Sequence, residues 1–254
     1  MNDCTTIVGL DVHKKTIVTA VLPAKAERVV ERSTLENCPK VIEKLVTRIG
    51  ARGPVVFVYE AGPCGYEVQR QISALGHRCV VIAPSMMPRR PGDRVKTDRR
   101  DAEKLARLYR AGELTIIYVP TREEEAARDL VRAREDAVGN RLRAQHRLSK
   151  FLLRQGRVHR ETKSWGVAHR AWLRRQRFEW TPLQQTYEAS MRALEDTEAQ
   201  VQTLDQQLEE LAHQEPYRTP VQYLRCLKGI DTLSALTLTV EVHTFQRFEQ
   251  ARAF

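Results

Sequence analysis

Four carboxylates stand at positions where an enzyme built on a β-sheet displays its chemistry. Asp11 follows the apolar stretch IVGL, and Glu60 follows the apolar stretch PVVFVY. Asp98 and Asp101 lie three positions apart, on one face of a predicted helix. Two divalent metal ions that cleave a phosphodiester need several hard oxygen ligands from different elements of the fold. We therefore predict that Asp11, Glu60, Asp98 and Asp101 are the catalytic residues and bind Mg²⁺ or Mn²⁺.

Each of these carboxylates also has an ordinary structural explanation. An aspartate such as Asp11 is common where a strand turns, and Asp98 and Asp101 could cap a helix or favour the positive end of its dipole. For a single residue the two interpretations are equally good. The joint placement of the four acids, at two strand ends and one helix start, favours a shared site.

Basic residues lie close to these acids in the sequence. An acidic site without them would repel a phosphate backbone, whereas lysine and arginine gain binding energy by releasing counterions, without reading the base sequence. For any single basic residue, a solvated charged face is the simpler interpretation. The residues that we assign to nucleic-acid binding here are Lys14, Lys15, Arg94, Lys96 and Arg99.

The net charge of +10 is unevenly distributed along the chain. Residues 141–177 contain twelve lysines and arginines and one acid, whereas residues 182–217 contain eight acids and one base. Unbalanced positive charge repels itself unless a partner neutralises it, so the basic run predicts a nucleic-acid surface. Its predicted binding residues are Arg143, Arg147, Lys150, Arg154 and Arg157.

The first 120 residues alternate between strand and helix patterns. β-Branched or continuous apolar runs predict strands, and apolar residues at helical spacing predict helices. The order β-β-β-α-β-α-β-α, with acids at the first strand, the fourth strand and the last helix, is that of the α/β ribonuclease H-like fold. Strands are expected at residues 7–10, 16–22, 28–34, 54–59 and 77–83, and helices at residues 38–50, 65–75 and 97–111.

Helical patterns dominate from residue 121 onward. Residues 183–211 carry apolar residues at close to heptad spacing, which predicts a coiled-coil arm or a helical hairpin. The stretch LKGIDTLSALTL resembles a helix-hairpin-helix that offers N–H groups to phosphate, but a plain helix start at Asp231 explains it equally well. We expect three parts: the α/β domain at 1–120, an all-α coiled-coil region at 121–215, and the start of a helical C-terminal domain at 216–254.

Composition limits the class of protein further. No apolar run is long enough to cross a bilayer and no signal segment is present, so we expect a cytoplasmic protein without a membrane partner. The five cysteines form no CxxC or CxxH pair, which argues against a zinc site or a redox motif.

Three motifs resemble those of a known family. GLDVHK, YEAGP and KTDRRDA together resemble the DEDD transposases and recombinases of bacterial insertion sequences, the IS110 group that includes the Piv-type invertases. The resemblance implies a RuvC-like catalytic domain, an inserted coiled coil and a C-terminal domain with a nucleophilic serine. It also implies metal-dependent cleavage and strand transfer on DNA, guided by a structured RNA. The family acts as dimers or tetramers, which here we expect to assemble through the coiled coil.

The same resemblance implies that one residue is missing. In the family the nucleophilic serine lies beyond the position that corresponds to Phe254, and no serine of this chain has its sequence context. We therefore expect a C-terminally truncated copy that binds nucleic acid but forms no covalent adduct with DNA.

Two other classes of function stay open on the sequence. The chain could be a nucleic-acid-binding remnant without catalysis. It could also be a kinase of the actin-like fold, which likewise opens with an aspartate-bearing strand. Such kinases place glycines in the first hairpin to cradle phosphate, where this chain has Val12, His13, Lys14 and Lys15.

Overall fold

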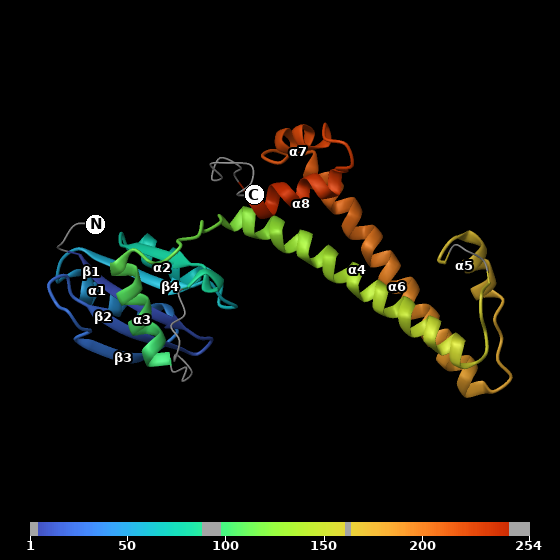
Figure 1. Ribbon diagram of the computed structural model, residues 1–254, viewed down its shortest axis with the longest axis horizontal. Helices are drawn as coiled ribbons and strands as arrows, with labels where there is room; N and C mark the ends of the chain where they lie inside the picture. Colours follow the sequence, from blue (N-terminus) through green and yellow to red (C-terminus); the bar gives the residue numbers. More distant parts are fainter. Residues whose placement is uncertain (1–4, 88–97, 161–163, 244–254) are drawn as a thin grey trace. The chain divides into compact units, whose positions relative to one another are not determined.

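The computed structural model describes residues 5–87, 98–160 and 164–243. The chain forms two compact units, Met1–Val119 and Pro120–Phe254, and each is described by itself (Figure 1). Within the described residues, the strands lie in the first unit and the second unit is helical.

The first unit is built on a five-stranded mixed sheet with the order β3-β2-β1-β4-β5. Strands β1, β2 and β3 form an antiparallel meander, and β4 and β5 continue the sheet parallel to β1. This order and these directions are those of the ribonuclease H-like fold, which confirms the fold class expected from the sequence. The strands span Thr6–Val12, Thr16–Leu22, Glu31–Glu36, Val55–Glu60 and Arg78–Ile82.

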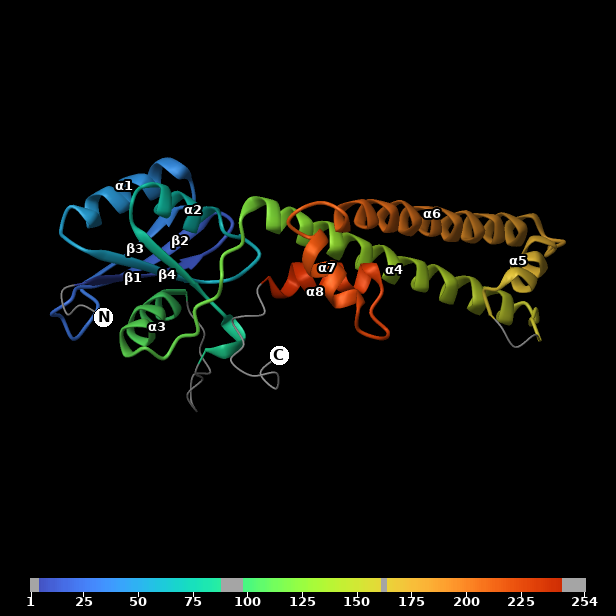
Figure 2. The ribbon, with the colours of Figure 1, turned by 90° about the horizontal axis from the view of Figure 1, so that it is seen from above.

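Helices cover both faces of this sheet (Figure 2). Helices α1 (Pro39–Gly50) and α2 (Glu67–Ala74) pack on one face, and helix α3 (Asp98–Ala111) packs on the other. The first five residues of β4 are all buried because the strand is covered on both sides. A short 3-10 helix, η1 (Pro84–Met86), follows β5.

Two details of the first unit differ from the sequence prediction. The third strand covers Glu31–Glu36 rather than 28–34, because pairing with β2 sets its ends and its β-branched start precedes the ladder. Residues 115–117, where no element was expected, bond to the outer edge of β5. Ala83 N–H donates to the Thr115 carbonyl at 3.1 Å, and Ile117 N–H donates to the Val81 carbonyl at 2.9 Å. These bonds cover part of an edge strand.

Two long helices dominate the second unit. Helix α4 (Arg122–Arg154) begins with a capping box formed by Thr121 and Glu124, and α6 (Thr181–Ala212) returns alongside it. The two helices run antiparallel, because Ala127 packs near the end of α6 whereas Leu148 packs near its start. The chain therefore forms the helical hairpin that the sequence left open as one of two possibilities.

The heptad-spaced residues of α6 are buried inside this hairpin. Tyr187, Leu194, Val201 and Leu208 follow one another at intervals of seven residues and are at most 4% exposed. Helix α4 supplies the residues that face them, among them Leu148. The same chain thus covers the apolar stripe from which the sequence predicted self-assembly.

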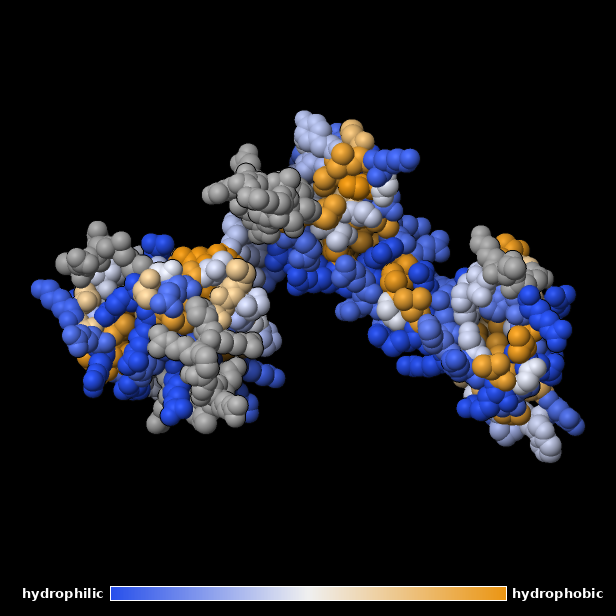
Figure 3. All heavy atoms as spheres, viewed as in Figure 1, coloured by the Kyte–Doolittle hydropathy of each residue, from blue (hydrophilic) through white to orange (hydrophobic). Residues whose placement is uncertain are grey.

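Short helices pack at the two ends of the hairpin. Helix α5 (Val167–Arg174) lies near the turn between α4 and α6, and α7 (Arg218–Arg225) and α8 (Thr232–Val242) lie near the open end. On the face shown in Figure 3, hydrophobic residues gather near these short helices, and hydrophilic residues cover α4 and α6 between them.

Asp231 caps the last of these helices. Its carboxylate accepts the Ser234 N–H at 2.7 Å. The turn before it contains Gly229, whose φ is 92°. Asp231 therefore does start a helix, and the glycine turn between α7 and α8 gives the segment the outline of a helix-hairpin-helix.

Candidate active site

Asp11 and Glu60 stand at the carboxyl ends of neighbouring parallel strands. Leu10 of β1 is in register with Tyr59 of β4, and the two acids are the next residues along each strand. Successive side chains of a strand point to opposite faces of the sheet. Leu10 and Tyr59 pack with α1 and α2, so Asp11 and Glu60 face the side covered by α3. The sheet thus brings the first two predicted acids to one edge.

Helix α3 runs antiparallel to β1 and begins at the same end of the sheet as these acids. Near the end of α3, the Arg110 guanidinium donates to the Leu22 carbonyl at 3.2 Å, and Leu22 is paired with Ile7 at the start of β1. A helix rises ~13.5 Å from Arg110 back to Asp101, and a strand advances ~13 Å from Ile7 to Asp11. The first turn of α3 therefore reaches the level of Asp11.

Gly9 sets how closely α3 can approach the sheet. A Cβ atom on Gly9 would lie 1.9 Å from the Ala102 carbonyl oxygen and 3.0 Å from the Ala106 amide nitrogen. Both are backbone atoms of α3, which cannot move aside as the end of a flexible side chain can. Glycine permits this contact because it has no Cβ. The contact brings the first turn of α3 against β1 two residues before Asp11.

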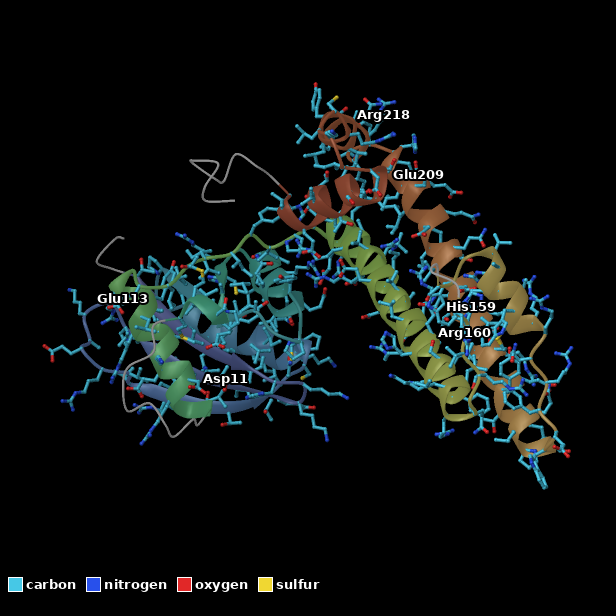
Figure 4. All side chains as sticks on the ribbon, turned by 45° about the vertical axis from the view of Figure 1, so that its right-hand side comes forward. Asp11, Glu113, His159, Arg160, Glu209 and Arg218 are labelled. Carbon is cyan, nitrogen blue, oxygen red and sulfur yellow. The ribbon has the colours of Figure 1, made fainter. Side chains whose placement is uncertain are left out.

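The structure describes three of the four predicted acids with their side chains. Asp11, Glu60 and Asp101 are partly buried, and the Asp11 side chain is 21% exposed. Asp98 begins α3, but its side chain lies outside the described residues. Figure 4 shows Asp11 at the end of the sheet where α3 begins and Glu113, which follows α3, toward the opposite end.

No cation position is defined by these side chains alone. Among the residues that the structure describes, no three His, Cys, Asp or Glu side chains form a group that could hold a metal ion. The predicted site includes Asp98 as well, whose side chain is not among them. A cation shared by Asp11, Glu60, Asp98 and Asp101 therefore stays a prediction.

His13 makes a contact with Asp11 that was not predicted from the sequence. The Nε2 atom of His13 lies 3.2 Å from Oδ2 of Asp11. A neutral imidazole can donate a ring N–H to a carboxylate and so orient it. The sequence contained a signal for this contact, because side chains two residues apart lie on one face of a strand.

The basic residues predicted near the acids are only partly described. Lys14 and Lys15 are exposed on the turn that follows β1. Arg94 and Lys96 lie outside the described residues, and so does the side chain of Arg99.

The basic residues predicted in the second unit form a stripe. Arg143, Arg147, Lys150 and Arg154 are exposed, and their spacing of four, three and four residues places them on one face of α4. This basic stripe is ~16 Å long at the rise of a helix. Arg157 follows the helix, is also exposed, and lies over the Phe178 ring at 5.7 Å from its centroid.

Acids of α6 neutralise part of the surrounding positive charge. The Arg170 guanidinium donates to both carboxylate oxygens of Glu198, at 2.6 and 2.8 Å, and this pair raises the pKa of Arg170 above its usual value. Just before the basic run, Arg134 donates to Asp205 at 2.7 Å. The antiparallel hairpin therefore brings together charges that the sequence separates, and the positive charge is less unbalanced than expected.

Comparison with known proteins shows the family. Residues 8–155 match the model of the DEDD transposases of the IS110 group, described as transposase. The chain is also 36% identical over 248 residues to the transposase for insertion sequence element IS1533 of Leptospira borgpetersenii. That match covers 96% of this chain and 72% of the relative. The chain belongs to the IS110 family of transposases.

A second relative of this transposase is y4qE of Sinorhizobium fredii, which is also named as a transposase. The two are 39% identical over 247 residues, and the match covers 96% of this chain and 60% of the relative. This chain thus spans 72% and 60% of the lengths of these two curated relatives.

A solved structure also shows some likeness. It is T. thermophilus RuvC in complex with Holliday junction substrate, at 13% identity and a TM-score of 0.25, and it covers 44% of this chain and 99% of that chain. The fold assignment of this transposase rests on its strand order and not on this likeness. None of the helices in the described ranges is long and apolar enough to span a membrane.

Proposed function

We propose that the acids at the carboxyl edge of the sheet cleave and transfer DNA strands with Mg²⁺ or Mn²⁺. The observation that carries this proposal is the placement of Asp11 and Glu60 on adjacent strand ends, on the face where α3 begins with Asp98 and Asp101. Carboxylate oxygens are the ligands that hard divalent cations prefer, so the donor set fits the metal. When bound, such ions supply stabilisation of the charge that develops on a phosphate during its transfer.

The neighbouring residues hold the acids and the DNA in place. His13 donates to Asp11 and fixes the orientation of that carboxylate. Gly9 lets the first turn of α3 stay against the strand ends. Lys14 and Lys15 reduce the repulsion between the acids and a phosphate backbone. These residues bind and orient the substrate, and the cytoplasm is the compartment where this transposase meets DNA.

Nicking of supercoiled plasmid DNA tests this function. We expect Mg²⁺-dependent nicking by the chain, and Asp11→Asn or Glu60→Gln should lower it by about 10- to 100-fold or more. Glu113→Gln, at the other end of α3, is the matched control and should leave the rate unchanged. We expect no protein covalently attached to the nicked DNA, since no serine of the chain has the context of the family's nucleophile. Equal rates in all variants would contradict the site.

We also propose that the basic stripe of α4 binds a structured guide RNA. The support is its exposure and its single helical face, which offer a row of positive charges to a phosphate backbone. Sequencing of the RNA that co-purifies with the chain tests this proposal. A single discrete RNA supports a guide, whereas a mixture in proportion to cellular RNA would contradict it.

Self-association of the transposase must use surfaces other than the buried stripe of α6. We propose dimers or tetramers that contact through the outer face of the hairpin. Leu142 and Leu153 of α4 are exposed apolar residues there, at 47% and 55%. Light scattering of the chain and of Leu142→Ser/Leu153→Ser measures the mass. We expect the substitutions to shift it toward the monomer, and a monomeric unsubstituted chain would contradict the proposal.

A further inference from the structure

The turn that carries Lys14 and Lys15 is held from outside by Asn37. The turn joins β1 to β2, and the His13 N–H donates to the Thr16 carbonyl at 2.9 Å. The side-chain amide of Asn37, which directly follows β3, donates from Nδ2 to the His13 carbonyl at 2.8 Å. The backbone N–H of Asn37 donates to the Lys15 carbonyl at 2.9 Å. One residue therefore holds the backbone on both sides of the turn.

The turn gains from this support because its own geometry does not suit a tight hairpin. Two-residue connections favour turns with positive φ, whose twist matches that of the strands, and other turns splay the strands. Across the described ranges, the residues other than glycine with positive φ are Trp165 and His243. Lys14 and Lys15 therefore have negative φ, and the Asn37 side chain adds the hydrogen bond that holds the turn closed.

The two contacts of Asn37 place different demands on the residue type. The backbone bond continues the ladder in which Thr16 pairs with Glu36, and any residue except proline can make it. The side-chain bond needs an amide donor on a side chain as short as that of asparagine. Aspartate has the same shape, but its ionised carboxylate can only accept. The side chain at position 37 therefore decides whether the His13 carbonyl is held.

We propose that Asn37 is a positioning residue for the phosphate-binding turn beside the acids. This inference rests on the proposed function. By holding the His13 carbonyl, Asn37 keeps the His13 ring at Asp11 and keeps Lys14 and Lys15 at the edge of the sheet where the acids lie. A turn fixed in advance loses less conformational freedom when it binds, so its lysines bind the backbone of a nucleic acid more tightly.

Affinity of the full chain for a DNA duplex, measured over a range of salt concentrations, tests this role. Asn37→Ala and Asn37→Asp should weaken binding and flatten the salt dependence, by about 0.9 log units of slope for each phosphate that the chain no longer neutralises. Gln71→Ala is the matched control. Gln71 also donates a side-chain amide to a backbone carbonyl in the first unit, that of Pro39 at 2.6 Å. It should leave the slope unchanged.

A lysine-free background separates positioning from folding. In Lys14→Ala/Lys15→Ala, the further change Asn37→Ala should leave the slope unchanged, because the residues that it positions are gone. Thermal unfolding should show a similar small loss for Asn37→Ala and Gln71→Ala, of about 2–4 °C at most. A structural role alone would lower the unfolding temperature without this dependence on the lysines.

Each outcome decides between the two proposals. Unchanged affinity and slope in Asn37→Ala, when the lysine substitutions lower both, would overturn the role of Asn37 and leave the proposed function standing. A further loss of slope in the lysine-free background would overturn it as well, since Asn37 would then act by another route. Failure of the unsubstituted chain to bind DNA would overturn the proposed function and this inference with it.

Discussion

The two units hold their charged residues in opposite ways. In the first unit, Asp11 and Glu60 end strands that are buried on both faces, and Gly9 brings a helix backbone into contact beside them. In the second unit, the basic stripe lies on the outer face of a helix whose inner face is buried. Acids that share a cation need fixed geometry, whereas a phosphate-binding stripe works through charge and tolerates movement. The two units should therefore respond differently to substitution.

Leu148→Ala should have the largest effect on stability, and it acts on the packing beneath the basic stripe. Leu148 is fully buried between α4 and α6, so its truncation leaves a cavity and costs about 2–5 kcal/mol. Urea unfolding followed by circular dichroism measures this loss. Leu142→Ala and Leu153→Ala lie on exposed positions of the same helix and should cost less than about 0.5 kcal/mol. Similar losses at the three positions would show that the hairpin is not packed as described.

Gly9→Ala should separate geometry from charge in the first unit. The added methyl group collides with the backbone of α3, which costs about 1–3 kcal/mol and moves the first turn of the helix away from Asp11. We expect weaker Mn²⁺ binding in a titration, although no acid is changed. Gly62→Ala is the control, because a Cβ there would meet only the Glu60 carbonyl oxygen, at 3.9 Å. Unchanged Mn²⁺ affinity in Gly9→Ala would mean that this contact does not set the site.

Asp231→Ala should cost about 1 kcal/mol at neutral pH, because it removes the cap of α8. The hydrogen bond from Ser234 N–H lowers the pKa of Asp231 below its usual 3.8. A lowered pKa in the folded state gives stability that is present above the unfolded pKa and lost as the pH falls through the folded pKa. The difference between Asp231→Ala and the unsubstituted chain in urea unfolding should therefore shrink below about pH 4. A difference that is constant from pH 7 to pH 3 would contradict this role, and Asp231→Asn, which can still cap, should lose less.

Neutralising the basic stripe should have the smallest effect on stability and sharpen the contrast between the units. Changing Arg147, Lys150, Arg154 and Arg157 to glutamine should flatten the salt dependence of DNA or RNA binding, by about 0.9 log units for each phosphate released on duplex DNA. The matched control changes four exposed bases of the first unit instead, Lys25, Arg28, Lys40 and Lys44. Equal slopes in the two sets would show that the stripe is an ordinary solvated face.

The sheet and its acid edge could be predicted because their signals are local. The continuous apolar run before Glu60 marks a strand buried on both faces, and Asp11 ends a similar run. Parallel strands bring their carboxyl ends to one edge, so the neighbourhood of Asp11 and Glu60 followed from the order of the elements. The capping acid Asp231 was also visible, as one of two interpretations of its segment.

Contacts between residues far apart in the chain could not be predicted in this way. The approach of α3 to Gly9, the hold of Asn37 on the His13 carbonyl and the pairing of Arg170 with Glu198 leave no periodic pattern in the sequence. The heptad spacing of α6 indicated a helical partner but did not say whether it was α4 of the same chain or a second copy.

The cation site shared by β1, β4 and α3 can be tested most directly by crystallography with Mn²⁺. Crystals of the chain soaked in Mn²⁺ and measured at the manganese absorption edge show where the cations bind. We predict one or two anomalous peaks coordinated by Asp11, Glu60, Asp98 and Asp101, at a spacing of about 3.5–4 Å if there are two. Peaks away from Asp11 and Glu60, or carboxylates of α3 turned to another face with no peak between them and the strand ends, would contradict the proposed active site.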